Sequence, residues 1–222
     1  MSEPTLRIRI GVNPQPVPYP FLKRVTDKVL TALLLALLAP VFAFVSGAIG
    51  LGMLLTRRDR GPWLYRERRI SRGREFDLLK FRVLRQEALE RTEGHSRLLE
   101  DDADNLTWAG RRMLKPWYLD ELPQLVNILR GDMSLVGPRP WPVSVVKAQV
   151  ANGLDYRNRL IAGWTGPAQV QKGLVETSHY TELDLAYVEA CRTWPSARLV
   201  RYDVVLLWRT VKLMVRREGL EF

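Results

Sequence analysis

Cysteine and histidine are scarce in this chain of 222 residues. Its one cysteine, Cys191, excludes an internal disulfide and suits a reducing cytoplasmic compartment. With only two histidines, His95 and His179, that cysteine cannot complete an ordinary zinc site. The sequence also contains no internal repeat and no low-complexity tract. Disulfide scaffolds and zinc modules are therefore excluded.

Charge is absent from a long apolar run between Val29 and Thr56. At ~1.5 Å per residue, a helix of this length exceeds the ~30 Å hydrocarbon core of a bilayer. Pro40 lies near the middle of the run, and both flanks are basic, so the positive-inside tendency places both ends on the cytoplasmic side. We therefore favour a re-entrant helix-break-helix over a spanning helix, although spanning helices with a proline kink are common.

Positive charge dominates the rest of the chain, with a net charge of +10 and a pI of about 10.1. This balance favours an anionic partner, which can be nucleic acid, acidic lipid headgroups or a phosphorylated substrate. Arginine is most frequent between Arg57 and Arg74, where a solvated basic face at a membrane surface is the simplest interpretation. The proline-rich residues 1–20 lack the apolar core of a signal peptide, so we expect an irregular arm.

Two adjacent acids, Asp120 and Glu121, precede apolar residues at helical spacing. Pro123 fits only the first turn of such a helix, and Gly131 is a plausible stop. The acids should therefore lie beside backbone N–H groups that have no intrahelical partner. Most acids at helix starts only cap the helix, with about 1 kcal/mol of stabilisation at the surface.

A braced arginine follows this helix and changes the interpretation of the two acids. Prolines on both sides of Arg139 restrict the backbone and should aim its guanidinium. A Pro-Arg-Pro turn alone is more often a rigid loop than a binding site. Two carboxylates, free N–H donors and a fixed arginine within one short stretch together indicate an anion-handling site.

The segment LDELPQLVNILRGDMSLVGPRP resembles the signature of the bacterial sugar transferases, the monotopic phosphoglycosyl transferases that start surface-glycan assembly. The resemblance extends from about Lys23 to Val211, and it implies the small form of this family. Family members carry a membrane hairpin with a proline at the break. Many have Ser-Pro there, whereas this chain has Ala39 before Pro40.

Further segments resemble the family's other landmarks. The residues Phe76, Lys80, Phe81 and Arg82 match a Phe-x-x-x-Lys-Phe-Arg pattern, which makes Lys80 and Arg82 candidates for diphosphate contacts. Lys115 stands where the family usually has arginine, and lysine lacks the bidentate fork for phosphate. Arg159 and Asp184 fall in two later landmarks and are candidates for substrate binding.

The resemblance implies transfer of a phospho-sugar from a nucleotide diphosphate sugar, usually UDP-linked, to polyprenol phosphate, with release of UMP. Asp120 would be the nucleophile that forms a covalent phospho-sugar intermediate, and Glu121 would place Mg²⁺ or handle a proton. Both carboxylates are candidate Mg²⁺ ligands, because this cation prefers hard oxygen ligands. Arg139 would contact the nucleotide, and Arg159 or Lys80 the phosphates.

We therefore predict a mainly α fold with minor β structure. The organisation would be an irregular arm at 1–20, a re-entrant membrane hairpin at 21–56 and a compact cytoplasmic catalytic domain with interfacial amphipathic helices at 57–222. Residues 86–105 read as an exposed loop, and Val143 to Val150 as a short helix. The last helix, Leu199 to Arg217, either packs on the domain or lies in the membrane interface.

The expected location is the inner membrane of a bacterium, with the catalytic domain on the cytoplasmic face. Expected partners are the nucleotide-sugar donor, polyprenol phosphate and membrane lipids, without nucleic acid; a homodimer stays open. The rival interpretation is a non-catalytic, membrane-tethered adaptor that binds acidic lipid or nucleic acid through its arginines. That interpretation explains the charge but leaves LDELPQL and GPRP without a purpose.

Overall fold

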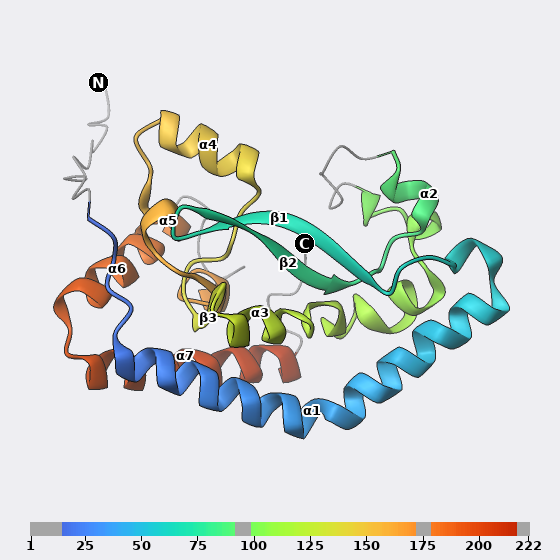
Figure 1. Ribbon diagram of the computed structural model, residues 1–222, viewed down its shortest axis with the longest axis horizontal. Coiled ribbons are helices and arrows are strands. Elements are labelled where there is room, and N and C mark those ends of the chain that lie inside the picture. Colours follow the sequence, from blue (N-terminus) through green and yellow to red (C-terminus); the bar gives the residue numbers. More distant parts are fainter. Residues whose placement is uncertain (1–14, 92–98, 172–178, 217–222) are drawn as a thin grey trace.

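The computed structural model describes residues 15–91, 99–171 and 179–216. Most of this part is helical, with two small two-stranded sheets, so the predicted mainly α class with minor β structure is confirmed (Figure 1). The first fourteen residues of the predicted arm, His95 and Arg217 lie outside the described residues. The rest of the arm has no helix or strand, and Val17 packs into the core with an exposed fraction of 2%.

The apolar run forms α1, Phe21–Leu55, as one continuous helix with Pro40 in its interior. A proline removes one helical hydrogen bond and crowds the preceding turn, which bends a helix. Figure 1 shows that α1 bends near its middle. Only 11% of its most apolar 18-residue window is buried, so α1 is a candidate for membrane insertion rather than a core helix. The structure thus has one bent helix where the sequence predicted two arms with a break.

A β-hairpin follows α1 and the short turn η1, Arg57–Asp59. It consists of β1, Leu64–Ser71, and β2, Arg74–Phe81, which pair antiparallel. The two-residue connection is Arg72-Gly73, with φ of 50° and 72°, the left-handed turn that suits the twist of a hairpin. The arginine-rich stretch is therefore partly a strand, which the charge pattern alone did not predict.

The segment that leads to the two acids consists of short helical turns. They are α2, Gln86–Leu89; η3, Ala103–Asn105; the π-helical turn η4, Gly110–Leu114; and η5, Leu119–Glu121. Then come α3, Gln124–Arg130, and the fully buried strand β3, Met133–Val136. Gly131 ends α3 with a φ of 88°, so the predicted helix and its glycine stop are confirmed, although Pro123 directly precedes α3 instead of lying in its first turn.

The second sheet joins distant parts of the chain, because β4, Ala162–Thr165, pairs parallel to β3. Between these strands lie α4, Val143–Ala151, and α5, Tyr156–Arg159, and after them comes η6, Gln169–Gln171. The short helix predicted from Val143 is thus confirmed. The side chains of β3 belong to a hydrophobic core that also takes residues from α3, α6 and α7.

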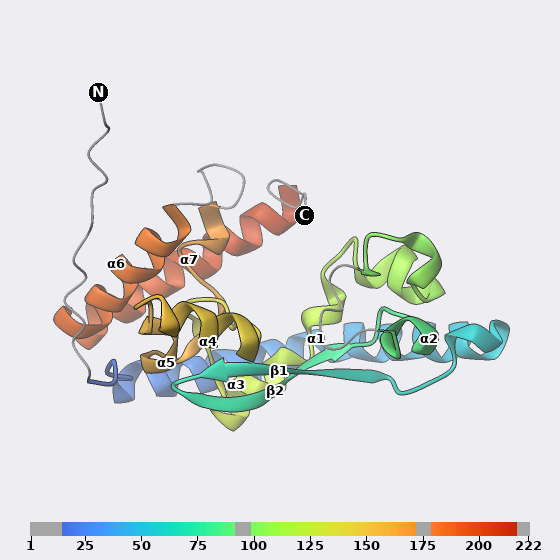
Figure 2. The same cartoon turned by 90° about the horizontal axis from the view of Figure 1, so that it is seen from above.

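The chain ends in two long helices, α6, His179–Thr193, and α7, Ser196–Arg216. One face of α7 packs on the domain, where Leu199 and Leu206 are 0% and 1% exposed. The same helix contacts α1 (Figure 2). It leaves Val204, Val205 and Trp208 exposed. Packing on the domain, one of the two predicted alternatives, is therefore present, together with a second, uncovered apolar face.

Candidate active site

The two acids lie on η5, directly before α3, where the turn packs against β2. Tyr118 enters the turn in the left-handed region, with a φ of 54°. The sequence predicted free backbone N–H donors beside these acids. Instead, the N–H groups of Glu121 and Leu122 bond to carbonyls three residues earlier, at 3.3 Å each. That expectation is wrong because a 3₁₀ turn uses these donors locally.

Asp120 is the more buried of the two acids, with an exposed fraction of 6%. Its carboxylate has no hydrogen bond or ion pair within the described part of the chain. Burial and then the neighbouring Glu121 charge raise the pKa of Asp120 to about 7, while Lys80 and Lys115 oppose the rise. A carboxyl with a pKa near neutrality is typical of a functional site. Its low exposure means that a substrate must displace neighbouring side chains to reach it.

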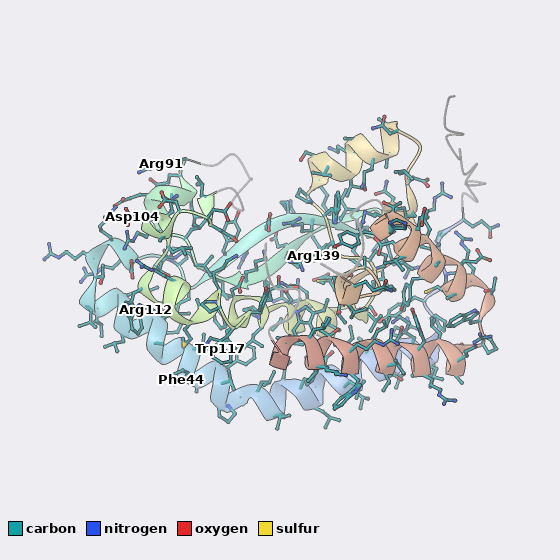
Figure 3. All side chains as sticks on the ribbon, turned by 180° about the vertical axis from the view of Figure 1, so that it is seen from behind. Phe44, Arg91, Asp104, Arg112, Trp117 and Arg139 are labelled. Atoms are coloured by element: carbon teal, nitrogen blue, oxygen red, sulfur yellow. The ribbon has the colours of Figure 1, made fainter. Side chains whose placement is uncertain are left out.

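Glu121 forms an ion pair with Arg139, and Nη2 of Arg139 lies 2.7 Å from Oε1 of Glu121. Burial acts to raise the pKa of Glu121, but Arg139 and Lys80 outweigh it and hold the pKa below its usual value. Glu121 in turn raises the pKa of Arg139. Arg139, labelled in Figure 3, keeps 48% of its side chain exposed. This pair is therefore charged at neutral pH and is partly open to solvent.

The Pro-Arg-Pro turn is held against β4 by an unusually close crossing of backbones. Gly137 N–H donates to the Thr165 carbonyl at 2.8 Å, and Gly163 N–H donates to the Pro138 carbonyl at 2.9 Å. A Cβ on Gly163 would lie 2.0 Å from the Gly137 nitrogen. Only glycine permits this approach, so the two glycines set the position of the turn that carries Arg139.

Two lysines complete the charged surroundings of Asp120. Nζ of Lys80, on β2, lies 3.6 Å from Oε2 of Glu67 on the neighbouring strand. Lys115 pairs with Glu100, at the start of the acidic run that read as solvated loop. Lys80, Lys115 and Arg139 are thus each paired with a carboxylate. Sequence reasoning missed Glu67 and Glu100, because such cross-strand and long-range pairings leave no local pattern.

The structure does not bring every candidate residue to this site. Arg82 is 3% exposed, and its guanidinium donates to three backbone carbonyls, those of Asp59, Pro62 and Leu84. It ties the end of β2 to the loop after α1, so we assign it a structural part. We leave it out of the proposed site.

The two later candidates, Arg159 and Asp184, are likewise held by neighbours outside the dyad. Arg159, at the end of α5, pairs with Asp155, the residue before that helix. Asp184, 1% exposed, accepts hydrogen bonds from Arg157 at 2.8 Å and from the Tyr156 hydroxyl at 3.0 Å. Asp184 is therefore joined to α5, and direct contact with a substrate is not the role that its environment favours.

The donor set of the dyad fits a magnesium ion that is shared with a substrate. Among the described residues, no group of three or more His, Cys, Asp or Glu side chains could hold a metal. Mg²⁺ is often held by one or two carboxylates, with the other ligands supplied by water and substrate phosphates. Asp120, whose carboxylate lacks a partner within the described chain, and the adjacent Glu121 match this requirement.

Comparison with known proteins identifies the family of this chain. The model of the family described as bacterial sugar transferase matches residues 18–217. The UDP-glucose:undecaprenyl-phosphate glucose-1-phosphate transferase of Caulobacter vibrioides is 35% identical over 200 residues, which cover 87% of this chain and 67% of the relative. The undecaprenyl-phosphate galactose phosphotransferase of Salmonella typhimurium is 31% identical over 213 residues, 90% of this chain and 41% of the relative.

The chain spans about two fifths of the length of several curated relatives, including the UDP-glucose:undecaprenyl-phosphate glucose-1-phosphate transferase of Escherichia coli, which is 31% identical over 199 residues. The match nevertheless covers α1, the two acids, the Pro-Arg-Pro turn and both final helices. The chain therefore belongs to the bacterial sugar transferase family.

Proposed function

We propose that this chain is a phosphoglycosyl transferase that moves a sugar 1-phosphate from a UDP-sugar to polyprenol phosphate, such as undecaprenyl phosphate, and releases UMP. The observation that carries the proposal is the placement of Asp120 beside the Glu121–Arg139 ion pair, with Lys80 and Lys115 as the next charges. Relatives whose names state this reaction support the choice of donor and acceptor.

In the first step, a carboxylate oxygen of Asp120 attacks the phosphorus that carries the sugar. A bond from Asp120 to that phosphorus forms, and the bond from the phosphorus to the bridging oxygen breaks, so that UMP leaves with the electron pair. In the second step, a phosphate oxygen of the acceptor attacks the same phosphorus and frees the aspartate. Nucleophilic catalysis thus divides one difficult exchange into two easier displacements.

The charged neighbours make this attack electrostatically feasible. A carboxylate near a diphosphate is repelled, so positive charge must compensate at the reacting atoms. Lys80 and Lys115 oppose the rise in the pKa of Asp120 that burial and Glu121 cause, so they are suited to supply this positive charge. Arg139 would bind the nucleotide portion, because its fork suits bidentate contacts with phosphate oxygens. Donor binding would then break the ion pair between Lys115 and Glu100, so that Lys115 contacts the diphosphate. Asp120 would become accessible to the donor at the same time.

Mg²⁺ fits the proposed site through Asp120 and Glu121. When bound, it would neutralise charge on the diphosphate oxygens and help to align the phosphorus. Glu121, kept ionised by Arg139, is suited to hold the cation without taking a proton. The proposed mechanism therefore includes a requirement for Mg²⁺ and separate roles for the two carboxylates.

The proposal also places α1 and the uncovered face of α7 in the inner membrane of a bacterium, with the domain on the cytoplasmic side. Phe44, labelled on α1 in Figure 3, is 66% exposed, and Trp208 on α7 is 68% exposed. Because α1 and α7 contact each other, these apolar surfaces belong to neighbouring elements. Basic residues on both sides of the uncharged run from Val29 to Thr56 favour a re-entrant path, which would bring the domain to the acceptor's phosphate.

The direct test measures UMP release from purified protein with UDP-sugars, polyprenol phosphate and Mg²⁺. We expect Asp120→Asn to lower turnover by about 1,000-fold or more and to abolish a trapped phospho-sugar adduct, because an amide is a poor nucleophile. Asp77→Asn is the matched control, since Asp77 lies on β2 and pairs with exposed Arg68. Retained turnover in Asp120→Asn would reject the nucleophile assignment. A wild-type protein that binds lipid vesicles but never releases UMP would favour the adaptor interpretation.

A further inference from the structure

The backbone of the Pro138-Arg139-Pro140 turn is held by a second arginine. Nη1 of Arg157, on α5, donates to the carbonyl oxygen of Arg139 at 2.8 Å. The same guanidinium lies 4.5 Å from the centre of the Trp141 ring, directly after the turn. Arg157 therefore contacts the turn through its backbone and its next aromatic side chain, and leaves the Arg139 side chain free for Glu121.

Asp184 supplies the counter-charge that stabilises the buried guanidinium of Arg157. The two side chains are only 7% and 2% exposed, and Nη2 of Arg157 lies 2.8 Å from Oδ2 of Asp184. A buried guanidinium without a counter-charge is strongly unfavourable, so Asp184 is required for Arg157 to remain in place. The Tyr156 hydroxyl also donates to Oδ2 of Asp184 at 3.0 Å, which fixes the carboxylate from a second direction.

The hydrogen bond from Arg157 to the Arg139 carbonyl restrains the backbone torsion ψ of Arg139. Pro140 confines Arg139 to extended backbone conformations, with ψ between about +120° and +160°. The value of ψ sets the direction of the Arg139 carbonyl relative to its side chain. A hydrogen bond from the rigidly held Arg157 selects one direction within this range. Arg69 holds the next carbonyl, that of Pro140, at 3.3 Å.

We propose that Arg157, with its charge balanced by Asp184, is the positioning residue for Arg139. The contacts run from Asp184 on α6 through Arg157 on α5 to the backbone of Arg139, whose guanidinium reaches Glu121. Asp184 thus acts on the reaction through two arginines instead of touching the substrate. This inference rests on the proposed function, because it assigns a purpose to the placement of Arg139.

A double-mutant cycle in the donor reaction tests the inference. Arg157→Lys is measured in the wild-type background and in Arg139→Ala, where no guanidinium remains to be positioned. We expect Arg157→Lys to lower kcat/KM for the UDP-sugar about tenfold in the first background, mainly through a higher KM for the donor, and less than about twofold in the second. Equal losses in both backgrounds would overturn the proposal, because they would indicate a general structural effect.

Arg198→Lys is the matched control. Arg198 also stacks on a tryptophan, 4.2 Å from the Trp194 ring centre, but it lies on α7. It should change kcat/KM less than about twofold in both backgrounds. If Arg157→Lys does not fold, Tyr156→Phe is used in the same cycle, because it removes one hydrogen bond to Asp184 and keeps the ion pair. A nonadditive loss would support the proposal, and an additive loss or no loss would overturn it.

The proposed function and this inference fail in different ways. A wild-type protein that releases no UMP contradicts the transferase proposal and, with it, any role for Arg157 in that reaction. An active wild-type protein with additive losses in the cycle contradicts only the positioning role. The Asp184→Asn variant supplies a further comparison, since it should raise the donor KM as Arg157→Lys does and leave the acceptor KM unchanged.

Discussion

Lys23 and Asp203 form a buried ion pair between the two ends of the chain, with 2.6 Å between Nζ of Lys23 and Oδ2 of Asp203. Lys23 belongs to the first turn of α1, and Asp203 lies on α7. Nζ of Lys23 also donates to the Val136 carbonyl at 3.1 Å, and the Tyr187 hydroxyl donates to Asp203 at 2.7 Å. The pair thus fastens α1 and α7 to β3, the strand that leads into the Arg139 turn.

Removal of one partner from this pair should destabilise the domain strongly. Lys23→Met leaves Asp203 buried and unpaired, and we expect a loss of about 3–5 kcal/mol in the free energy of unfolding. Lys23→Met combined with Asp203→Leu should recover part of this loss, because the two apolar side chains need no counter-charge, whereas buried Asp27, which pairs with Lys23 at 3.8 Å in the wild type, still lacks one. Thermal unfolding in detergent measures both variants, with exposed Lys28→Met as the control. A double variant no more stable than the single one would contradict the explanation.

The pH dependence of the reaction should follow the ionisation of Asp120. Its pKa is raised to about 7, so the carboxyl is protonated and non-nucleophilic below this pH and charged above it. The value of kcat/KM should therefore rise with pH and level off above about 7. Lys115 lowers the pKa of Asp120 and Glu100 raises it. Lys115→Met should accordingly move the rise to higher pH, and Glu100→Gln to lower pH. Shifts in the same direction would refute this account.

The close backbone contact between Gly137 and Gly163, next to the Pro-Arg-Pro turn, should not tolerate a side chain. A methyl group at position 163 would collide with the Gly137 backbone, so Gly163→Ala should cost about 3 kcal/mol or more and displace Arg139. Gly47→Ala is the matched control, because a Cβ there meets nothing within 4 Å. Chemical denaturation and kcat/KM for the donor measure the two effects. A Gly163→Ala variant as stable as the wild type would contradict such a close approach of the two backbones.

Arg82 should matter for folding and not for donor binding. Arg82→Lys keeps the charge but loses the fork that reaches the carbonyls of Pro62 and Leu84 together with that of Asp59. We expect a loss of about 3 kcal/mol in unfolding free energy, with the donor KM changed less than about twofold in the folded protein. Arg68→Lys, at an exposed position on β1, is the control. A large rise in donor KM without loss of stability would instead support a diphosphate contact.

The uncovered face of α7 should contribute to membrane binding. Trp208→Ser removes a large apolar surface that is 68% exposed, and we expect partition into vesicles to weaken by about 2 kcal/mol. Val150→Ser is the control, because Val150 lies on α4, which Figure 1 places on the side of the hairpin away from α1. Vesicle flotation measures both proteins. If Trp208→Ser and the wild type partition equally into vesicles, the exposed face of α7 does not contribute to membrane binding.

Several elements followed from local patterns in the sequence. The uncharged run specified a long apolar helix, because its composition suits no other element of that length. Gly131 ended α3 as predicted, since a left-handed residue at a helix end favours glycine. The adjacency of Asp120 and Glu121 and the bracing of Arg139 by prolines could likewise be read directly. The Arg72-Gly73 hairpin was missed, because arginine is not among the residues that favour the first position of such a turn.

By itself, then, the sequence determined the apolar helix, the acidic pair and the constrained arginine, because each depends on neighbours within one or two turns of chain. The tertiary structure decided which charges meet: Arg139 with Glu121, Lys115 with Glu100 and Arg157 with Asp184. These pairs form between elements brought together by packing, and any arginine could in principle pair with many acids. The physical reason is that ion pairing has little sequence specificity, whereas packing leaves a buried charge only one or two opposite charges within reach.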